Sequence, residues 1–286
     1  MDVNGAKLHV ARVGQGRPLL LLHGWPEFWL TWEPIMMRLA DRFELIAPDL
    51  RGFGDSDMPK GAFGPEQQTD DMSTLIAALH LGPVGVVAHD IGGAISQALA
   101  RKRPEQIAGL FFFDFIYPGI GDRFMGAGRG ALTWYFHFHQ SDLAPRPLSA
   151  TPETVRLYIS HFLKDWAFRK DAFDGVLDAF VSAYQRPGVI EGSLAHYRAR
   201  RSEHDAAAPR PLLSPAPIDL PTCVRWAEHD KLFDFEWTDR LPEFFGHLDL
   251  EFFPGVGHFP HREDPDRAAD EISKFFGRLE RTGWKR

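Results

Sequence analysis

The sequence predicts an α/β protein with a mostly parallel, doubly wound sheet and an inserted helical cap. Short apolar runs alternate with amphipathic segments, and each run leads into a turn that carries Gly, Asp or His. Parallel strands are buried on both faces, so they read as continuous hydrophobic runs separated by helical crossovers. Five runs fit this pattern: residues 18–22, 43–47, 84–88, 107–113 and 223–227.

The two ends of the chain add elements to this sheet. Residues 8–16 (LHVARVGQG) read as a strand that ends in a glycine turn, a pattern typical of an antiparallel edge hairpin. Residues 248–253 predict a last strand, and residues 264–279 have the apolar spacing of a closing helix.

The middle of the chain breaks the alternation. From Tyr117 to about Pro217 the pattern is helical and rich in aromatic residues, with no convincing buried strand. Its end carries five prolines between Pro209 and Pro221, which favour an extended, stiff connector. We therefore expect a core formed by residues 1–117 and 218–286, and a helical cap formed by residues 118–217.

Composition restricts the partners and the compartment. The 286 residues carry a formal net charge of −7, and no basic run stands out, which disfavours a nucleic-acid surface. The start lacks the basic and apolar regions of a signal peptide, and no apolar run is long enough to span a bilayer. A single cysteine, Cys223, is compatible with a reducing compartment. We expect a cytoplasmic monomer or homodimer that binds neither nucleic acid nor membrane.

The most informative stretch is residues 86–93 (VVAHDIGG), an apolar strand that runs into a turn and then into a helix beginning with small residues. Such an elbow exposes one polar side chain at the carboxyl edge of the sheet, beside helix N-terminal amides. Here that side chain is Asp90. The alternative interpretation is an aspartate that only caps the helix.

Three other motifs occur at corresponding strand ends: HGWP at 23–26, DLRGFGDS at 49–56 and GHF at 257–259. Together with the elbow they resemble the oxyanion turn, the DxRGxGxS loop and the catalytic histidine turn of the α/β-hydrolase family. The resemblance is to its branch with an aspartate nucleophile, which contains epoxide hydrolases, haloalkane dehalogenases and fluoroacetate dehalogenases. It covers essentially the whole chain and implies the α/β-hydrolase fold. One departure is Ala88, where the usual elbow carries glycine.

The chemistry of an aspartate nucleophile selects its substrate. A carboxylate with a reference pKa of about 3.9 is ionised at pH 7 and attacks without a base. Attack on an ester would give a reactive anhydride, whereas attack on a strained or halogenated saturated carbon gives a stable alkyl ester. Hydrolysis of that ester needs water activated by a neutral histidine, the role expected of His258. The backbone N–H groups of Trp25 and Ile91 are expected to bind the oxyanion.

Two aspartates compete to be the carboxylate partner of His258. Asp230 follows the run at 223–227 and matches the family's most frequent acid position. Asp114 follows the preceding run and matches an alternative position used by some dehalogenases and by a bacterial group of epoxide hydrolases. We favour Asp230, and the sequence leaves open that Asp114 holds His258 or that both approach it.

The leaving group decides between an epoxide and a carbon–halogen bond, because an alkoxide oxygen needs acidic O–H or N–H donors. Tyr197 resembles the cap tyrosine that precedes Arg in epoxide hydrolases. The second donor is either Tyr135, at the spacing before Gln that these enzymes use, or His161, which resembles the histidine of one bacterial subgroup.

The dehalogenase pattern fits less well. Haloalkane dehalogenases usually hold the halide with a tryptophan directly after the nucleophile, where this chain has Ile91. Fluoroacetate dehalogenases carry arginines in the elbow, where Ile91 and Ala94 stand here. Trp166 nevertheless resembles the fluoride-holding tryptophan of that group.

The sequence therefore predicts an epoxide hydrolase that acts on a small hydrophobic epoxide with water. The alternatives are a dehalogenase acting on an organohalide, and a ligand-binding protein without catalysis. No cofactor is expected. No metal is expected either, because His137, His139 and His261 lack the acidic or cysteine partners in sequence that a metal centre requires.

Overall fold

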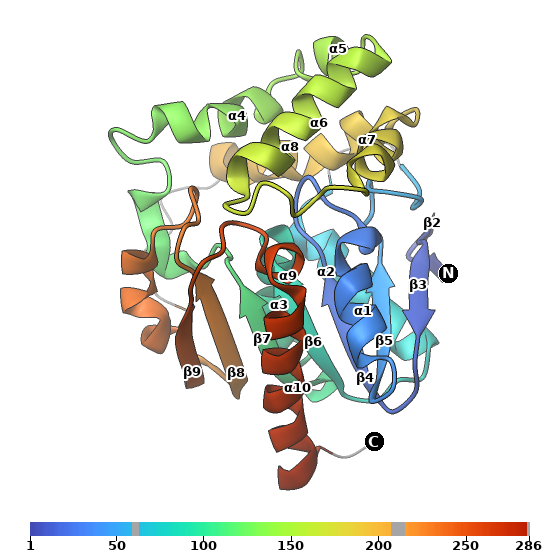
Figure 1. The fold of residues 1–286 in the computed structure, drawn as a ribbon, viewed down its shortest axis with the longest axis vertical. Helices are drawn as coiled ribbons and strands as arrows, with labels where there is room; N and C mark the ends of the chain where they lie inside the picture. Colours follow the sequence, from blue (N-terminus) through green and yellow to red (C-terminus); the bar gives the residue numbers. More distant parts are fainter. Residues whose placement is uncertain (59–62, 207–214, 285–286) are drawn as a thin grey trace.

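The computed structural model describes residues 1–58, 63–206 and 215–284, and these form a central sheet between two layers of helices (Figure 1). Seven strands lie in the order β3-β5-β4-β6-β7-β8-β9. All neighbouring pairs are parallel except β3 with β5. The strands span Val10–Val13 (β3), Arg17–Leu22 (β4), Phe43–Pro48 (β5), Val84–His89 (β6), Ile107–Phe113 (β7), Ile218–Ala227 (β8) and Phe245–Phe253 (β9).

The five predicted parallel strands and the last strand are confirmed, although β8 and β9 begin earlier than predicted, and β9 starts at Phe245 rather than at 248. β8 begins at Ile218, five residues before the apolar run at 223–227. Proline cannot donate a backbone hydrogen bond within a sheet, so Pro221 is atypical of a strand interior, and the sequence does not predict this earlier start. The pairing register shifts between Ile218 and Pro221. The predicted edge hairpin is wrong in its pairing: β3 is an antiparallel edge strand, but it pairs with β5 rather than with the next strand. A separate hairpin forms from β1 (Asp2–Val3) and β2 (Ala6–Lys7).

Helices cover both faces of the sheet, as a doubly wound fold requires. Alternate residues of β4 point to opposite cores. Leu20 and Leu22 join the core that contains residues of α2 and α3, whereas Leu19 and Leu21 join the core that contains residues of α1 and α10. These helices span Glu33–Leu39 (α1), Pro65–Ala78 (α2), Ile91–Lys102 (α3) and Pro265–Thr282 (α10). The predicted closing helix is therefore confirmed.

A further set of helices, here called the helical layer, lies over one end of the sheet at the top of Figure 1. It comprises α4 (Gly130–Gln140), α5 (Pro145–Leu148), α6 (Pro152–Trp166), α7 (Leu177–Gln185) and α8 (Val189–Ala206). Residues 118–206 and 215–217 contain no strand, as expected, and residues 207–214 of the proline-rich connector lie outside the described residues. The division into a core and a cap stays a prediction.

Short helices complete the connections. The 3-10 helices are η1 (Trp29–Trp32), η2 (Pro104–Gln106), η3 (Pro118–Arg123) and η4 (Phe235–Glu243), and α9 spans Pro260–Glu263.

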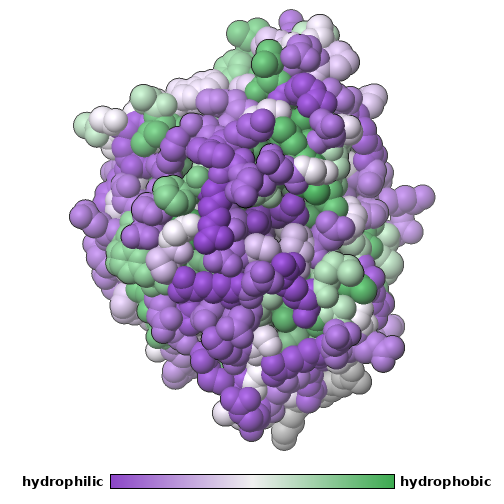
Figure 2. Space-filling model, in the orientation of Figure 1, coloured by the Kyte–Doolittle hydropathy of each residue, from purple (hydrophilic) through white to green (hydrophobic). Residues whose placement is uncertain are grey.

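The face shown in Figure 2 is mostly hydrophilic, with apolar residues in separate patches. None of the helices in the described ranges is long and apolar enough to cross a membrane.

Candidate active site

Asp90 lies at the sharp turn between β6 and α3, with φ 48° and ψ −113°. This backbone conformation is rare for a residue with a side chain and is typical of functional turns. The turn leaves no room for a side chain at Gly24, where a Cβ would lie 2.5 Å from the Cβ of Asp90. The predicted elbow is therefore present in the structure, with Asp90 at its apex.

Two backbone amides from different loops hold one oxygen of Asp90. The N–H of Ile91 donates to Oδ1 at 2.6 Å, and the N–H of Trp25 donates to the same oxygen at 3.1 Å. A capping aspartate ordinarily accepts from the second or third helical amide of its own helix. Donation by the first amide and by a remote loop is instead the arrangement of an oxyanion site, so the predicted pair of donors comes together at Asp90.

His258 faces the other oxygen of Asp90 and is held from behind by Asp230. Its Nε2 lies 4.0 Å from Asp90 Oδ2, and its Nδ1 lies 2.8 Å from Asp230 Oδ2. The second oxygen of Asp230 accepts the N–H groups of Leu232 and Phe233, at 2.7 and 3.3 Å. Burial opposes the charged imidazole, but the carboxylates of Asp230 and then Asp90 outweigh it and raise the pKa of His258.

Asp114 does not contact the imidazole. Its Oδ1 accepts the N–H of Ala227 at 2.9 Å, and its Oδ2 has no hydrogen-bond partner in the described part of the chain. Burial, and then the nearby charge of Asp230, raise the pKa of Asp114 well above its usual value. The geometry thus favours Asp230 as the partner of His258, and burial favours the neutral form of Asp114.

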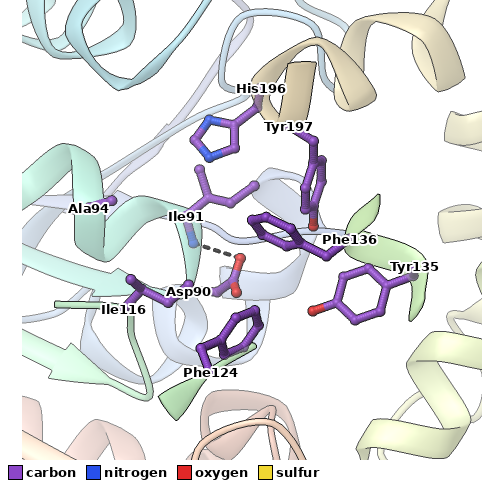
Figure 3. A pocket seen from close by; sticks show the side chains of 9 residues that line it. All are labelled: Asp90, Ile91, Ala94, Ile116, Phe124, Tyr135, Phe136, His196 and Tyr197. Atoms are coloured by element: carbon purple, nitrogen blue, oxygen red, sulfur yellow. Dashed lines mark hydrogen bonds between the residues drawn. The ribbon is translucent and has the colours of Figure 1, made fainter. Parts of the chain in front are cut away.

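The helical layer covers the site from above and leaves a small pocket beside Asp90 that is partly open to solvent. Tyr135 of α4 and Tyr197 of α8 direct their hydroxyls toward Asp90 (Figure 3). Burial is the main cause that raises the pKa of both phenols, and the charge of Asp90 adds to it. Both are therefore protonated donors at neutral pH. The pocket is lined by Asp90, Ile91, Ala94, Ile116, Phe124, Tyr135, Phe136, His196 and Tyr197.

His161, the alternative second donor, does not reach the pocket. It is exposed on α6, whose buried face carries Ile159, Phe162 and Trp166. A helix has 3.6 residues per turn, so position 161 lies on the face opposite to these residues. The resemblance that suggested His161 is therefore not supported by its placement, and Tyr135 occupies the position beside Tyr197.

Several residues at the site were not predicted from the sequence. His139, four residues after Tyr135 on α4, is buried and bonds through Nε2 to the hydroxyl of Tyr158 at 2.7 Å. Burial lowers the pKa of His139 to about 3, so its ring is neutral. Its ring centroid lies 4.6 Å from those of Trp25 and Tyr197. The i, i+4 spacing from Tyr135 was the signal available in the sequence.

A second unpredicted group lies beneath the elbow. Glu27, His89 and His261 are fully buried, and one potential ligand atom from each lies within 4.8 Å of the others. Both oxygens of Glu27 already accept hydrogen bonds from the two imidazoles, at 2.7 and 2.8 Å. The donor set could hold a metal ion only by displacing these protons. A second such group, His9, Asp49 and Asp55, lies nearer the surface.

Comparisons with known proteins identify the family of this chain. A family model described as the alpha/beta hydrolase fold matches residues 17–265. The chain is 30% identical over 289 residues to the soluble epoxide hydrolase of Corynebacterium sp. (strain C12), a match that covers 97% of this chain and 96% of that relative. It is also 29% identical over 210 residues to a fluoroacetate dehalogenase of Burkholderia sp, which covers 70% of this chain and 67% of that relative.

A solved structure shows the same likeness in three dimensions. The epoxide hydrolase CorEH without ligand superposes with a TM-score of 0.85 at 28% identity, and the match covers 97% of both chains. The family model, the relatives and the solved structure agree on the family and on the fold. The chain therefore belongs to the α/β-hydrolase family and is an epoxide hydrolase-like member of it.

Proposed function

We propose that the chain opens epoxides through an alkyl ester on Asp90 and hydrolyses this ester to a vicinal diol. One observation carries the proposal: two buried, protonated tyrosine hydroxyls point toward the Asp90 carboxylate from the helical layer. A site that had only to bind a ligand would need neither these donors nor a His258–Asp230 pair beside the carboxylate.

In the first step the Oδ2 of Asp90 attacks an epoxide carbon. The amides of Trp25 and Ile91 hold Oδ1, so Oδ2 is the oxygen available for attack. The carbon–oxygen bond of the ring breaks, and the leaving oxygen takes a proton from the hydroxyl of Tyr197 or Tyr135. The products of this step are an alkyl ester on Asp90 and a tyrosinate that is later reprotonated.

In the second step His258 removes a proton from water through Nε2, and the resulting hydroxide adds to the Cγ of Asp90. The negative charge then develops on Oδ1, where the two amides already lie. Asp230 stabilises the imidazolium that forms. Collapse of the tetrahedral intermediate expels the diol oxygen, which takes the proton from His258, and leaves Asp90 as a carboxylic acid with one oxygen derived from water. The proton of this acid returns to the tyrosinate, which restores both the Asp90 carboxylate and the tyrosine hydroxyl.

Dehalogenation is the second candidate function, because Trp166 packs directly against the site. Its ring centroid lies 5.1 Å from that of His258 and 5.7 Å from that of Trp25. A fluoroacetate dehalogenase is among the relatives. The pocket, however, has Ile91 and Ala94 at the elbow, and neither offers a charge to a substrate carboxylate. This favours an uncharged substrate.

The test is the intact mass of a His258→Gln variant after incubation with styrene oxide, and separately with a haloalkane and with fluoroacetate. Loss of the base strands the ester, so we expect a mass increase equal to the whole epoxide, localised to Asp90. The matched control is the Asp90→Asn, His258→Gln double variant, which has no carboxylate to alkylate and is expected to stay unmodified.

Two other outcomes would change the assignment. An adduct that forms only from a halogenated substrate, with the halogen lost, would make the protein a dehalogenase. No adduct from any of the three substrates, in a variant that is folded by circular dichroism, would favour the non-catalytic binding protein.

A further inference from the structure

Glu27 connects the three loops that carry the proposed catalytic groups. It is fully buried, and its Oε2 accepts the N–H of Gly24 at 2.9 Å and Nδ1 of His89 at 2.7 Å. Its Oε1 accepts the hydroxyl of Thr31 at 2.5 Å and Nε2 of His261 at 2.8 Å. One carboxylate therefore binds the loop before Trp25, the residue before Asp90 and the short helix after His258.

The hydrogen-bond pattern determines which nitrogen of each ring carries a proton. A carboxylate only accepts, so His89 donates through Nδ1 and His261 donates through Nε2. The opposite nitrogens, Nε2 of His89 and Nδ1 of His261, are buried and have no partner among the described residues. A proton on either of them would be a buried, unsatisfied donor, which costs about 1–3 kcal/mol. Burial lowers the pKa of His261 to about 4, in keeping with a neutral ring.

The charge of Glu27 is retained in this network. Burial favours the neutral acid, but the two histidines outweigh it and lower the pKa of Glu27 well below its usual value. Four donors then satisfy the buried carboxylate, as a buried charge requires. Removal of this charge would leave several donors without an acceptor.

The position of Trp25 depends on this network. The Gly24 N–H held by Glu27 immediately precedes the Trp25 N–H that donates to Asp90 at 3.1 Å. The loop packs so closely on the elbow that a methyl group at Gly24 would overlap Asp90. A small displacement of the loop therefore changes the geometry of the oxyanion donor.

The orientation of His258 depends on the same network. The ring of His89 packs against the ring of His258 with centroids 4.7 Å apart and an interplanar angle of 61°. It also packs against the ring of His261, at 4.9 Å. Glu27 holds the rings of His89 and His261 by hydrogen bonds. The packing of His89 against His258 then limits how far the His258 ring can rotate while it keeps its hydrogen bond to Asp230.

We propose that Glu27 is a positioning residue that sets the oxyanion donor and the His258 ring for hydrolysis of the ester. This inference rests on the proposed function, because it assigns Glu27 to the second half of that reaction. Charge develops on Asp90 Oδ1 mainly in this half, so a misplaced donor slows hydrolysis more than it slows alkylation.

The test is Glu27→Gln, assayed for diol formation and for the adduct that accumulates on Asp90 during turnover. Loss of one oxyanion donor in other enzymes costs about 10²–10³ in kcat, so displacement of the donor is expected to cost about 10- to 100-fold. KM is expected to stay equal or fall, and the variant is expected to carry the epoxide mass at steady state. Loss of folded protein alone would lower the rate without raising the modified fraction.

The matched control is Asp71→Asn, which also removes a buried carboxylate charge. Asp71 is fully buried and pairs with Arg51 at 2.7 Å, away from the pocket. Its kcat per folded molecule is expected to stay within about threefold of wild type, since no oxyanion donor is attached to it.

The outcomes separate the inference from the proposed function. If wild type turns over an epoxide and folded Glu27→Gln retains its kcat within twofold, the inference is wrong and the proposed function stands. If wild type acts on no epoxide, the proposed function fails and the inference fails with it. If Glu27→Gln does not fold, ¹⁵N NMR of the wild-type imidazoles decides. Protons on Nδ1 of His89 and Nε2 of His261 support the proposed role of Glu27, and the opposite tautomer of either ring overturns that role.

Discussion

Replacement of Asp230 by Asn tests which carboxylate supports His258. The contact between Asp230 Oδ2 and His258 Nδ1 is 2.8 Å long, and both side chains are fully buried. During hydrolysis the imidazole becomes charged, so Asp230 stabilises the transition state of this step. An Asn at this position would also offer N–H to Nδ1 and favour the tautomer in which Nε2 is already protonated.

The size of the effect follows from the geometry. Charge centres about 4 Å apart interact by about 4 kcal/mol at the effective dielectric constant of about 20 that suits protein sites. Since each 1.36 kcal/mol is a factor of ten, we expect hydrolysis in Asp230→Asn to slow by about 10³-fold. Alkylation of Asp90 needs no base, so the ester is expected to accumulate and to be visible by intact mass within one turnover.

Asp114→Asn is the matched comparison. Burial and the charge of Asp230 raise the pKa of Asp114 and so favour its neutral form, which Asn resembles in charge and shape. The Asn oxygen still accepts the N–H of Ala227. We expect single-turnover hydrolysis to remain within about threefold of wild type, because neither oxygen of Asp114 forms a hydrogen bond with His258. A loss in Asp114→Asn that equals the loss in Asp230→Asn would refute this assignment of roles.

Three further predictions concern pH, the ring-opening donor and the elbow. Two carboxylates raise the pKa of His258, so the imidazole of the free enzyme is charged below that pKa, and diol formation should fall as the pH falls through it. Esterification of Asp90 removes one of these two negative charges. The rate of single-turnover hydrolysis should therefore fall at a lower pH than the pKa that NMR titration gives for His258 in the free enzyme. Tyr197→Phe should slow adduct formation by about 10²-fold and leave ester hydrolysis unchanged, whereas His161→Ala, an exposed position, should alter neither rate in rapid-quench assays. Gly24→Ala places a Cβ 2.5 Å from the Cβ of Asp90 and should slow adduct formation by about 10²-fold or more. Gly130→Ala is the control, because a Cβ there meets no atom within 4 Å, and its rate should match wild type. Equal rates of adduct formation in the two variants would contradict the close approach of Gly24 to Asp90.

The positions of the strands along the chain and the elbow could be predicted because local patterns determine them. Continuous apolar runs followed by Gly, Asp or His mark parallel strands and the ends where side chains are exposed. The elbow also needs glycine at close approaches: a Cβ on Gly92 would overlap the backbone of Leu22, and a Cβ on Gly24 would overlap Asp90. The start of β8 was missed because Pro221 interrupts the apolar pattern, and the partner of β3 was missed because strand pairing is a long-range property.

The choice between candidate residues needed the tertiary structure. Asp114 and Asp230 both follow neighbouring strands, and only the three-dimensional path of the two turns brings Asp230 to His258 and leaves Asp114 against Ala227. His161 and Tyr135 both lie on helices of the layer, and the rotation of α6 about its axis turns His161 to solvent.

By itself, then, the sequence determined the class of fold and indicated the proposed nucleophile with its proposed base, because these depend on residue type at strand ends. Only the tertiary structure decided which carboxylate, which tyrosines and which buried network surround them. Glu27 contacts residues up to 234 positions away in the chain, and no local pattern records a hydrogen bond across that separation. Contacts of this kind depend on how loops pack, and packing is a property of the whole folded chain.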